Sequence, residues 1–194
     1  LIVALLYACI IAHECAHAFA ARRCGVKTSA IILSAIGGEA VLSRNATCWA
    51  DELRIASVGP IINALFALVF AMFVPVFAQS ILLTNILLFL ASSNALLAII
   101  NIIPGFPLDG GRVLRAILWG ATGNRSKAAT ISTFVGKAIG AIIAVCGSVL
   151  LLTADWNGLL IVGLGWYMFD ASARELESED IRSILEHSHA SDVL

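Results

Sequence analysis

The chain alternates long apolar runs with short polar intervals, and this pattern predicts a bundle of membrane helices. The predicted helices cover residues 1–24, 53–78, 81–103, 128–152 and 159–172. A helix of about 20 apolar residues is long enough to cross the hydrocarbon core of a bilayer. The pattern therefore predicts five membrane segments, the last shorter than the others, and then a polar tail over residues 173–194.

Residues 28–42 have a different pattern. They contain several β-branched side chains, are too short to span a bilayer, and are interrupted by the pair Gly37 and Gly38. Such a segment is expected to form a short hairpin or a re-entrant element. Backbone outside a helix is tolerated at membrane depth only where protein or water covers it. We therefore expect a short membrane-associated β-hairpin, lying over a cavity, in an otherwise all-α polytopic membrane protein.

The composition agrees with a membrane protein. The 194 residues are 60% hydrophobic and 13% charged, whereas soluble domains are about one quarter charged. The net charge of -1 gives no support to nucleic-acid binding. Residue 1 already belongs to an apolar run with no basic leader or cleavage site, so no signal peptide is predicted, and we expect the chain to begin partway into a longer protein.

The spacing of the cysteines does not indicate a functional site. The five cysteines are scattered without C-x-x-C spacing, at Cys9, Cys15, Cys24, Cys48 and Cys146. We interpret them as small buried hydrophobic residues, neither a disulfide framework nor a second metal site.

The positions of the basic residues predict the orientation in the membrane. Lys and Arg follow the first, third and fifth segments, except for Lys137 inside the fourth, whereas the loops at 79–85 and 153–157 have none. By the positive-inside rule the basic loops and the tail are cytoplasmic. His13 and His17 then lie in the half of their helix nearer the cytoplasm, and Asp109 lies at the cytoplasmic end of its segment. These three side chains are therefore expected at one depth.

The stretch His13-Glu14-Cys15-Ala16-His17 carries the clearest chemistry in the chain. At positions i and i+4 of a helix, two imidazoles project from one face and can bind one metal ion, with the glutamate beside it. Chance matches to H-E-x-x-H usually fall on solvated helices, but this one lies inside an apolar run. Ionisable groups at membrane depth cost several kcal/mol unless paired or coordinated, which favours a functional role.

A catalytic zinc takes three protein ligands and keeps a fourth position for water, so a third ligand is needed. Asp51 and Glu52 are expected to serve as N-cap and first-turn acids of the second segment. Asp155 falls in a loop on the opposite side of the membrane. Asp109 is the best candidate by topology, and Glu39 is the second.

Two further motifs give the chain a family resemblance. One is Gly-Pro-x-x-Asn at residues 59–63, and the other is the run Asn101-x-x-Pro104-x-x-Pro107-Leu108-Asp109-Gly110-Gly111. Together with H-E-x-x-H in a membrane helix, they resemble the site-2 protease family of intramembrane zinc metalloproteases over roughly residues 1–125. The resemblance implies that His13, His17 and Asp109 bind one Zn²⁺ and that Glu14 is the catalytic base.

The same resemblance implies features outside the motifs. No insertion large enough for a PDZ domain lies between them, which is similar to the prokaryotic members without that domain. The end of the tail resembles the lead into the CBS domains that some members carry, and a further membrane helix is expected ahead of the motif helix. Glu39 stands where an apolar residue is expected, so its role stays open. His187 and His189 in the tail are expected to be solvated.

The predicted function is hydrolysis of a peptide bond in or near a transmembrane segment of a membrane-protein substrate, in a prokaryotic cell membrane. The expected partners are that substrate and membrane lipid, with no nucleic acid, and a homo-oligomer is left open. Asn101 and Asn63 are candidate donors to the oxyanion or to the substrate backbone. Bonding to the carbonyls of a broken helix is an equal alternative for both.

Two other functions would use similar residues. A transporter would also place acids and broken helices at membrane depth, but it predicts an inverted repeat, which the sequence lacks. A zinc-binding sensor without catalysis needs the same three ligands. Glu14 distinguishes the sensor from the enzyme, because it has no ligand role and a sensor would not require it.

Overall fold

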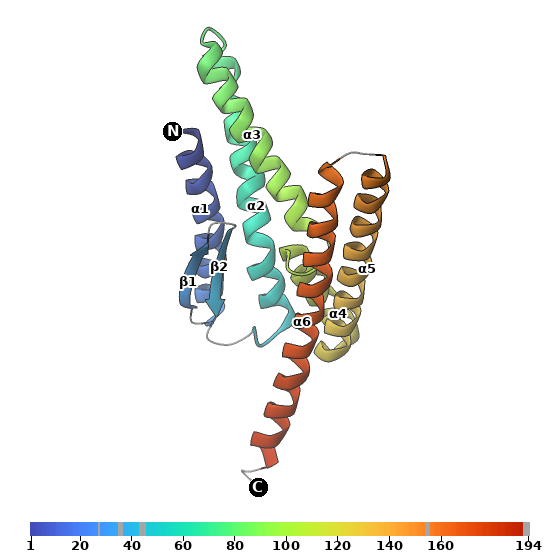
Figure 1. Ribbon diagram of the computed structural model, residues 1–194. Helices are drawn as coiled ribbons and strands as arrows, with labels where there is room; N and C mark the ends of the chain where they lie inside the picture. Colours follow the sequence, from blue (N-terminus) through green and yellow to red (C-terminus); the bar gives the residue numbers. More distant parts are fainter. Residues whose placement is uncertain (27, 35–36, 43–45, 154–155, 192–194) are drawn as a thin grey trace. The chain divides into compact units, whose positions relative to one another are not determined.

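The computed structural model describes residues 1–26, 28–34, 37–42, 46–153 and 156–191, with side chains for 1–26, 46–153 and 156–178. The elements in chain order are α1 (Ile2–Arg23), β1 (Thr28–Ser34), β2 (Gly37–Leu42), α2 (Trp49–Phe73), the 3-10 helix η1 (Pro75–Phe77), α3 (Ile81–Ile102), α4 (Asp109–Thr122), α5 (Arg125–Leu152) and α6 (Asn157–Ser191) (Figure 1). The chain forms two compact units, Leu1–Ile102 and Ile103–Leu194.

In the first unit, many of the buried side chains of α1 and α2 are small or polar. The buried residues of α2 recur every three or four positions, which places them on one face of the helix: Glu52, Ile55, Ala56, Gly59, Pro60 and Asn63. The buried residues of α1 follow the same spacing and include Cys9, His13, His17 and Ala21. Helix α2 packs against α1 and against α3. The interior of this unit is therefore richer in polar groups than the core of a soluble domain.

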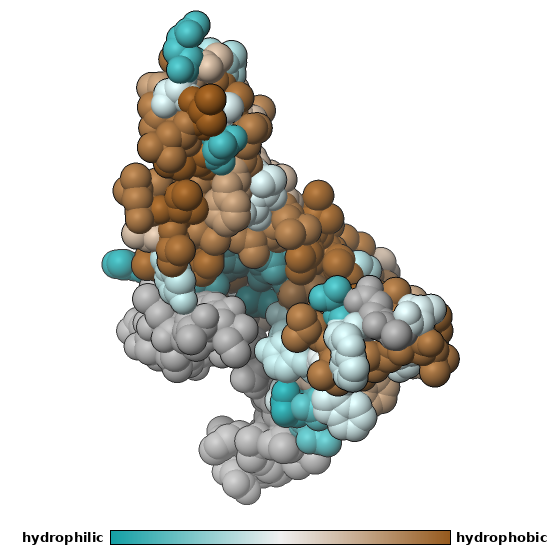
Figure 2. All heavy atoms as spheres, turned by 45° about the horizontal axis from the view of Figure 1, so that its top comes forward, coloured by the Kyte–Doolittle hydropathy of each residue, from teal (hydrophilic) through white to brown (hydrophobic). Residues whose placement is uncertain are grey.

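Large apolar side chains lie on the outside of the same helices. Ile61, Leu65, Leu68 and Met72 of α2 are all at least half exposed, and Figure 2 shows hydrophobic side chains over much of the visible surface. Four described helical segments are long and apolar enough to cross a membrane: α1, α2 with η1, α3 and α5. This confirms a helical polytopic membrane protein. The fifth predicted segment lies in α6, which is not among these four.

The two strands occupy the interval for which a hairpin was expected. They pair antiparallel, with Leu33 opposite Gly38 and Ile32 opposite Glu39, and the register shifts between Thr28 and Ala30. Both strands contact α1, and Figure 1 shows them beside that helix. Whether this hairpin touches the membrane stays a prediction.

In the second unit, α5 packs against α4 and α6. Glycines allow α5 and α6 to approach closely, since a Cβ atom on Gly140 would lie 2.8 Å from the carbonyl oxygen of Gly165. A Cβ atom on Gly147 would lie equally close to the carbonyl oxygen of Gly158. Small residues that bring two backbones together are typical of helix pairs in membranes.

Several helix ends differ from the predicted ones. Helix α2 begins at Trp49 rather than at residue 53, with Cys48 as its N-cap, so Asp51 lies in the first turn and the predicted N-cap role for Asp51 is wrong. Helix α5 begins at Arg125 rather than at residue 128, because the side chain of Asn124 accepts a hydrogen bond from the backbone N–H of Lys127 at 2.9 Å.

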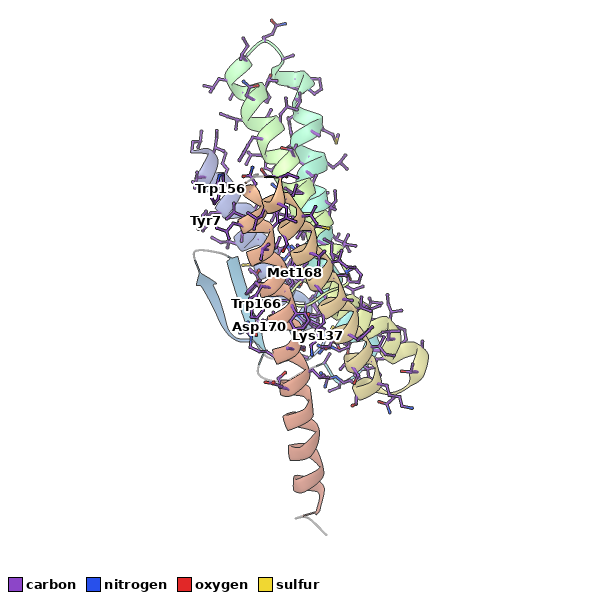
Figure 3. The ribbon with its side chains drawn as sticks, turned by 45° about the vertical axis from the view of Figure 1, so that its right-hand side comes forward. Tyr7, Lys137, Trp156, Trp166, Met168 and Asp170 are labelled. Atoms are coloured by element: carbon purple, nitrogen blue, oxygen red, sulfur yellow. The ribbon has the colours of Figure 1, made fainter. Side chains whose placement is uncertain are left out.

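The last helix differs most from its prediction. Residues 159–172 were expected to form a short segment of their own, followed by a polar tail. Instead, α6 runs without a break from Asn157 to Ser191. Trp156, Trp166, Met168 and Asp170 mark the start and the middle of this helix in Figure 3.

Candidate metal centre

The two histidines of the motif lie together on the buried face of α1. Their Nε2 atoms are 3.1 Å apart, and the side chains are only 7% (His13) and 5% (His17) exposed. The Nδ1 atom of His17 lies 2.7 Å from the carbonyl oxygen of Ile55 in α2. Because a carbonyl oxygen can only accept, Nδ1 carries the hydrogen, and Nε2 of His17 then has a lone pair available for a ligand.

The spacing of the two nitrogens suits zinc. Two nitrogen ligands at about 2.0–2.1 Å from a tetrahedral zinc ion lie about 3.3 Å from each other, and the observed Nε2–Nε2 distance is 3.1 Å. A ligating histidine usually donates its other ring N–H to a carbonyl or a carboxylate, as His17 does to Ile55. The pair therefore has the donor atoms, spacing and outer hydrogen bond of two zinc ligands.

Gly59 of α2 provides the space beside these imidazoles. A Cβ atom at this position would lie 2.5 Å from Cε1 and 2.7 Å from Nε2 of His13, and it would also overlap Nε2 of His17. Real Cβ atoms essentially never approach other heavy atoms so closely. In the sequence Gly59 stands out only as part of a family motif, since a contact between two helices leaves no local pattern.

Replacing Gly59 with Ala is expected to weaken metal binding and destabilise the protein. The methyl group must push the two imidazoles apart, and inserting a group into a packed interior typically costs about 1–3 kcal/mol. Zinc content and thermal unfolding in detergent measure both effects. Gly163→Ala in α6 is the matched control, because a Cβ atom there meets nothing within 4 Å. Equal behaviour of the two variants would contradict this account of Gly59.

Three other predicted residues have distinct places in the first unit. Glu14 is 9% exposed on α1, so the predicted base lies out of bulk solvent. Asn63 is 2% exposed, one helical turn beyond Gly59 on the buried face of α2, and its Oδ1 accepts no hydrogen bond from the described residues. Asn101 is half-buried, near the C-terminal end of α3.

Asn94 is a buried polar residue that the sequence analysis did not assign to the site. It is fully buried on α3, and its side-chain amide donates to the carbonyl oxygen of Leu90 at 2.8 Å. Its Oδ1 atom has no partner among the described residues. The only sequence signal for this residue was an amide side chain within an apolar run.

Asp109 belongs to the second unit, where it is half-buried as the first residue of α4. The helix begins shortly after Pro104 and Pro107, which cannot continue α3. Gly111, two residues after Asp109, is required by close packing. A Cβ atom at this position would lie 2.8 Å from both the carbonyl carbon of Gly105 and the backbone nitrogen of Phe106. Glu39, the second candidate, lies in β2, and its side chain is outside those that the structure describes.

Comparisons with known proteins place these residues in a family. The model of Peptidase family M50 matches residues 1–82 and 76–143. Rip3 of Mycobacterium tuberculosis, named as a candidate zinc metalloprotease, is 32% identical over 178 residues, which are 90% of this chain and 45% of Rip3. A zinc metalloprotease of Methanocaldococcus jannaschii is 29% identical over 190 residues, 98% of this chain and 53% of that protein.

A solved structure of a related protease is also similar to this chain. The site-2 protease from Methanocaldococcus jannaschii matches with a TM-score of 0.68 and 30% identity, over 89% of this chain and 76% of that one. The chain spans about half the length of the curated relatives that it matches. The family model covers well over half of the chain, including H-E-x-x-H and the Leu-Asp-Gly element. The chain therefore belongs to Peptidase family M50.

Proposed function

We propose that the chain is the membrane-embedded catalytic part of a zinc metalloprotease that cleaves transmembrane segments of other membrane proteins. The observation that carries this proposal is the buried pair of imidazoles on α1. The two Nε2 atoms lie at ligand spacing, and Glu14 follows His13 in a helix that is apolar enough to span a bilayer. The printed names of the relatives support zinc and proteolysis as the chemistry.

The third zinc ligand in this proposal is Asp109. It lies in the Leu-Asp-Gly element, and its position at the start of α4 follows a loop packed tightly by Gly111. A carboxylate beside two neutral imidazoles is a common ligand set of catalytic zinc, as in the His₂Glu sites of other metalloproteases. Zinc held there supplies Lewis-acid activation of water and of the scissile carbonyl.

The chain's own side chains supply the proton transfers. Glu14 accepts the proton of the attacking water and then donates it to the leaving amine, and its burial keeps bulk water from competing for that proton. Asn63 and Asn101 are proposed as hydrogen-bond donors to the carbonyl oxygen or the substrate backbone. Asn63 is the better supported of the two, because it lies one turn from Gly59 on the same face of α2.

The proposed substrate is a transmembrane helix with a weak point. The carbonyl groups of a helix accept hydrogen bonds from the residue four positions later, so cleavage requires local unwinding. Residues that weaken the helix near the scissile bond should favour cleavage. Among the described strands, β1 and β2 pair only with each other, and an unwound segment could be held at an outer edge of this hairpin by β-addition.

The fifth membrane segment and the sidedness also belong to this proposal. The first part of α6, residues 157–172, packs against the span-length helix α5 through facing glycines and exposes Leu159, Leu160 and Trp166. This supports a fifth segment in the membrane. The basic loops support a site nearer the cytoplasm, with the C-terminal part of α6 on that side.

Zinc removal tests the proposed function. The purified chain in detergent is expected to contain about one zinc per chain and to cleave a model transmembrane peptide that carries a helix-weakening residue. Treatment with 1,10-phenanthroline should abolish cleavage, and added zinc should restore it. Absence of zinc from every preparation, or cleavage that survives removal of the metal, would contradict the proposal. Zinc binding without cleavage of any such peptide would favour the sensor.

A further inference from the structure

The loop that leads to Asp109 is held by α6. The hydroxyl of Ser172 donates a hydrogen bond to the carbonyl oxygen of Phe106 at 3.1 Å, although 66 residues separate the two positions. Both partners are buried, with Ser172 fully inaccessible and Phe106 only 4% exposed. Phe106 precedes Asp109 by three residues, so the bond anchors the backbone immediately before the proposed ligand.

A contact between charged side chains joins α4 to α6, and its arginine also lies against the loop at Phe106. The guanidinium of Arg115, in α4, donates to the carboxylate of Glu175, in α6, at 2.5 Å. The same guanidinium lies over the Phe106 ring, 5.2 Å from its centroid. Arg115 is 4% exposed and the Glu175 side chain is 30% exposed, so the pair is partly buried and salt screens it less than a fully exposed pair. One turn of α6 therefore contacts the loop through Ser172 and the helix that begins at Asp109 through Glu175.

The loop packs closely against α5 and α6 at Gly105 and Phe106. A Cβ atom on Gly136 of α5 would overlap the hydroxyl oxygen of Ser172 and lie 3.1 Å from the backbone nitrogen of Phe106. On α6, the methyl carbon of Met168, labelled in Figure 3, lies 3.3 Å from where a Cβ atom of Gly105 would be. Close-packed interiors transmit small displacements, so a movement of α6 at Ser172 must move the loop.

We propose that Ser172 and Glu175 are positioning residues for Asp109, and that they couple the cytoplasmic extension of α6 to the metal centre. The proposal rests on the proposed function above. Glu175 lies where the helix turns from apolar to polar, and the helix continues for four more turns to Ser191. A force or a partner that displaces this extension therefore acts first on the turn that holds Phe106 and Arg115.

Glu175→Gln tests the coupling, with Glu177→Gln as the matched control. Glu177 is exposed on the same helix two residues further on, so the chemical change is identical but the contact with α4 is not involved. The first readout is amide hydrogen exchange of residues 103–112 in the metal-free protein. Glu175→Gln should speed exchange of this segment severalfold and leave peptides from α3 and α5 unchanged, whereas Glu177→Gln should change neither.

The second readout is the affinity for zinc together with the kinetics of cleavage. Outer-shell partners that contact a metal ligand typically contribute about 10–100-fold in affinity or activity. Glu175 acts on Asp109 only through Arg115 and α4, so Glu175→Gln should lower zinc affinity by about 10-fold or less. The loss should appear in kcat with KM unchanged, because no substrate contact is removed. Ser172→Ala, which deletes one hydroxyl, should give a smaller loss of the same kind and covers the case in which Glu175→Gln fails to fold.

The outcomes separate this inference from the proposed function. If wild type binds zinc and cleaves while Glu175→Gln and Ser172→Ala match Glu177→Gln in exchange and in affinity, the coupling is wrong and the function stands. If wild type binds no zinc, the function fails, and the exchange measurement still decides whether α6 holds the loop.

Discussion

Replacing Glu14 with Gln is expected to lower the rate of peptide cleavage by about 10²–10⁴-fold while leaving the zinc content unchanged. A general base contributes a factor of this size, and the amide of Gln has nearly the same shape but cannot accept the proton of the attacking water. Glu14 is 9% exposed, so bulk water has little access to this position and does not readily act as the proton acceptor in its place. The measurement is single-turnover cleavage of a model transmembrane peptide beside zinc per chain.

Cys15→Ser is the control for Glu14→Gln. Cys15 is the next residue of the same helix, and its substitution should change neither zinc content nor cleavage appreciably because it is exposed. The interpretation of the five cysteines as buried is wrong for Cys15 and Cys146, which are exposed, and holds only for Cys9 as a fully buried residue. If Glu14→Gln cleaves as fast as wild type, Glu14 is not the base. If the variant loses zinc, Glu14 acts on the metal site itself, and the distinction drawn between enzyme and sensor no longer holds.

The parts of the site that could be predicted from sequence are those that depend on local periodicity. Two histidines four positions apart must share a face of any helix that contains them, and the apolar run around them predicted that helix. The start of α4 at Asp109 was predictable for a similar reason, because Pro104 and Pro107 cannot continue α3. In each case the relevant atoms are close in sequence, so no tertiary information was needed.

The parts that could not be predicted depend on contacts between distant segments. The hydrogen bond from His17 to Ile55 and the space left by Gly59 exist only because α1 and α2 pack together. The extension of α6 was missed for a different reason. The charged residues from Arg174 onward were interpreted as leaving the membrane, but Glu and Arg are good helix formers, so leaving the bilayer did not require the helix to end.

Two buried asparagines show most clearly what could not be predicted from the sequence. Asn63 and Asn94 are both almost inaccessible, and both keep a side-chain oxygen without a partner among the described residues. A buried acceptor without a donor is costly, and its cost depends on neighbours that the sequence does not reveal. From sequence, only Asn63 was singled out, because it belonged to a motif.

Asp109→Ala is expected to remove most of the bound zinc. Outer-shell partners of a ligand contribute about 10–100-fold in zinc affinity, and deleting a direct ligand should cost more than that. Where wild type is purified with about one zinc per chain, the variant should lose nearly all of its zinc on dialysis. The measurement is zinc per chain and zinc affinity in detergent. Asp170→Ala is the control, because Asp170 is a half-exposed acid of the same unit that pairs with Arg174 one turn later on α6.

The result for Asp109 also decides which residue completes the ligand set. His13 and His17 belong to the first unit and Asp109 to the second, so a loss of zinc confined to Asp109→Ala means that one ion is bound by ligands from both. Two neutral imidazoles alone bind zinc more weakly than the same pair with a carboxylate, since the anion adds direct charge attraction. If Asp109→Ala retains zinc and Glu39→Ala loses it, the hairpin supplies the third ligand, and the proposed role of α6 in positioning Asp109 loses its connection to the metal.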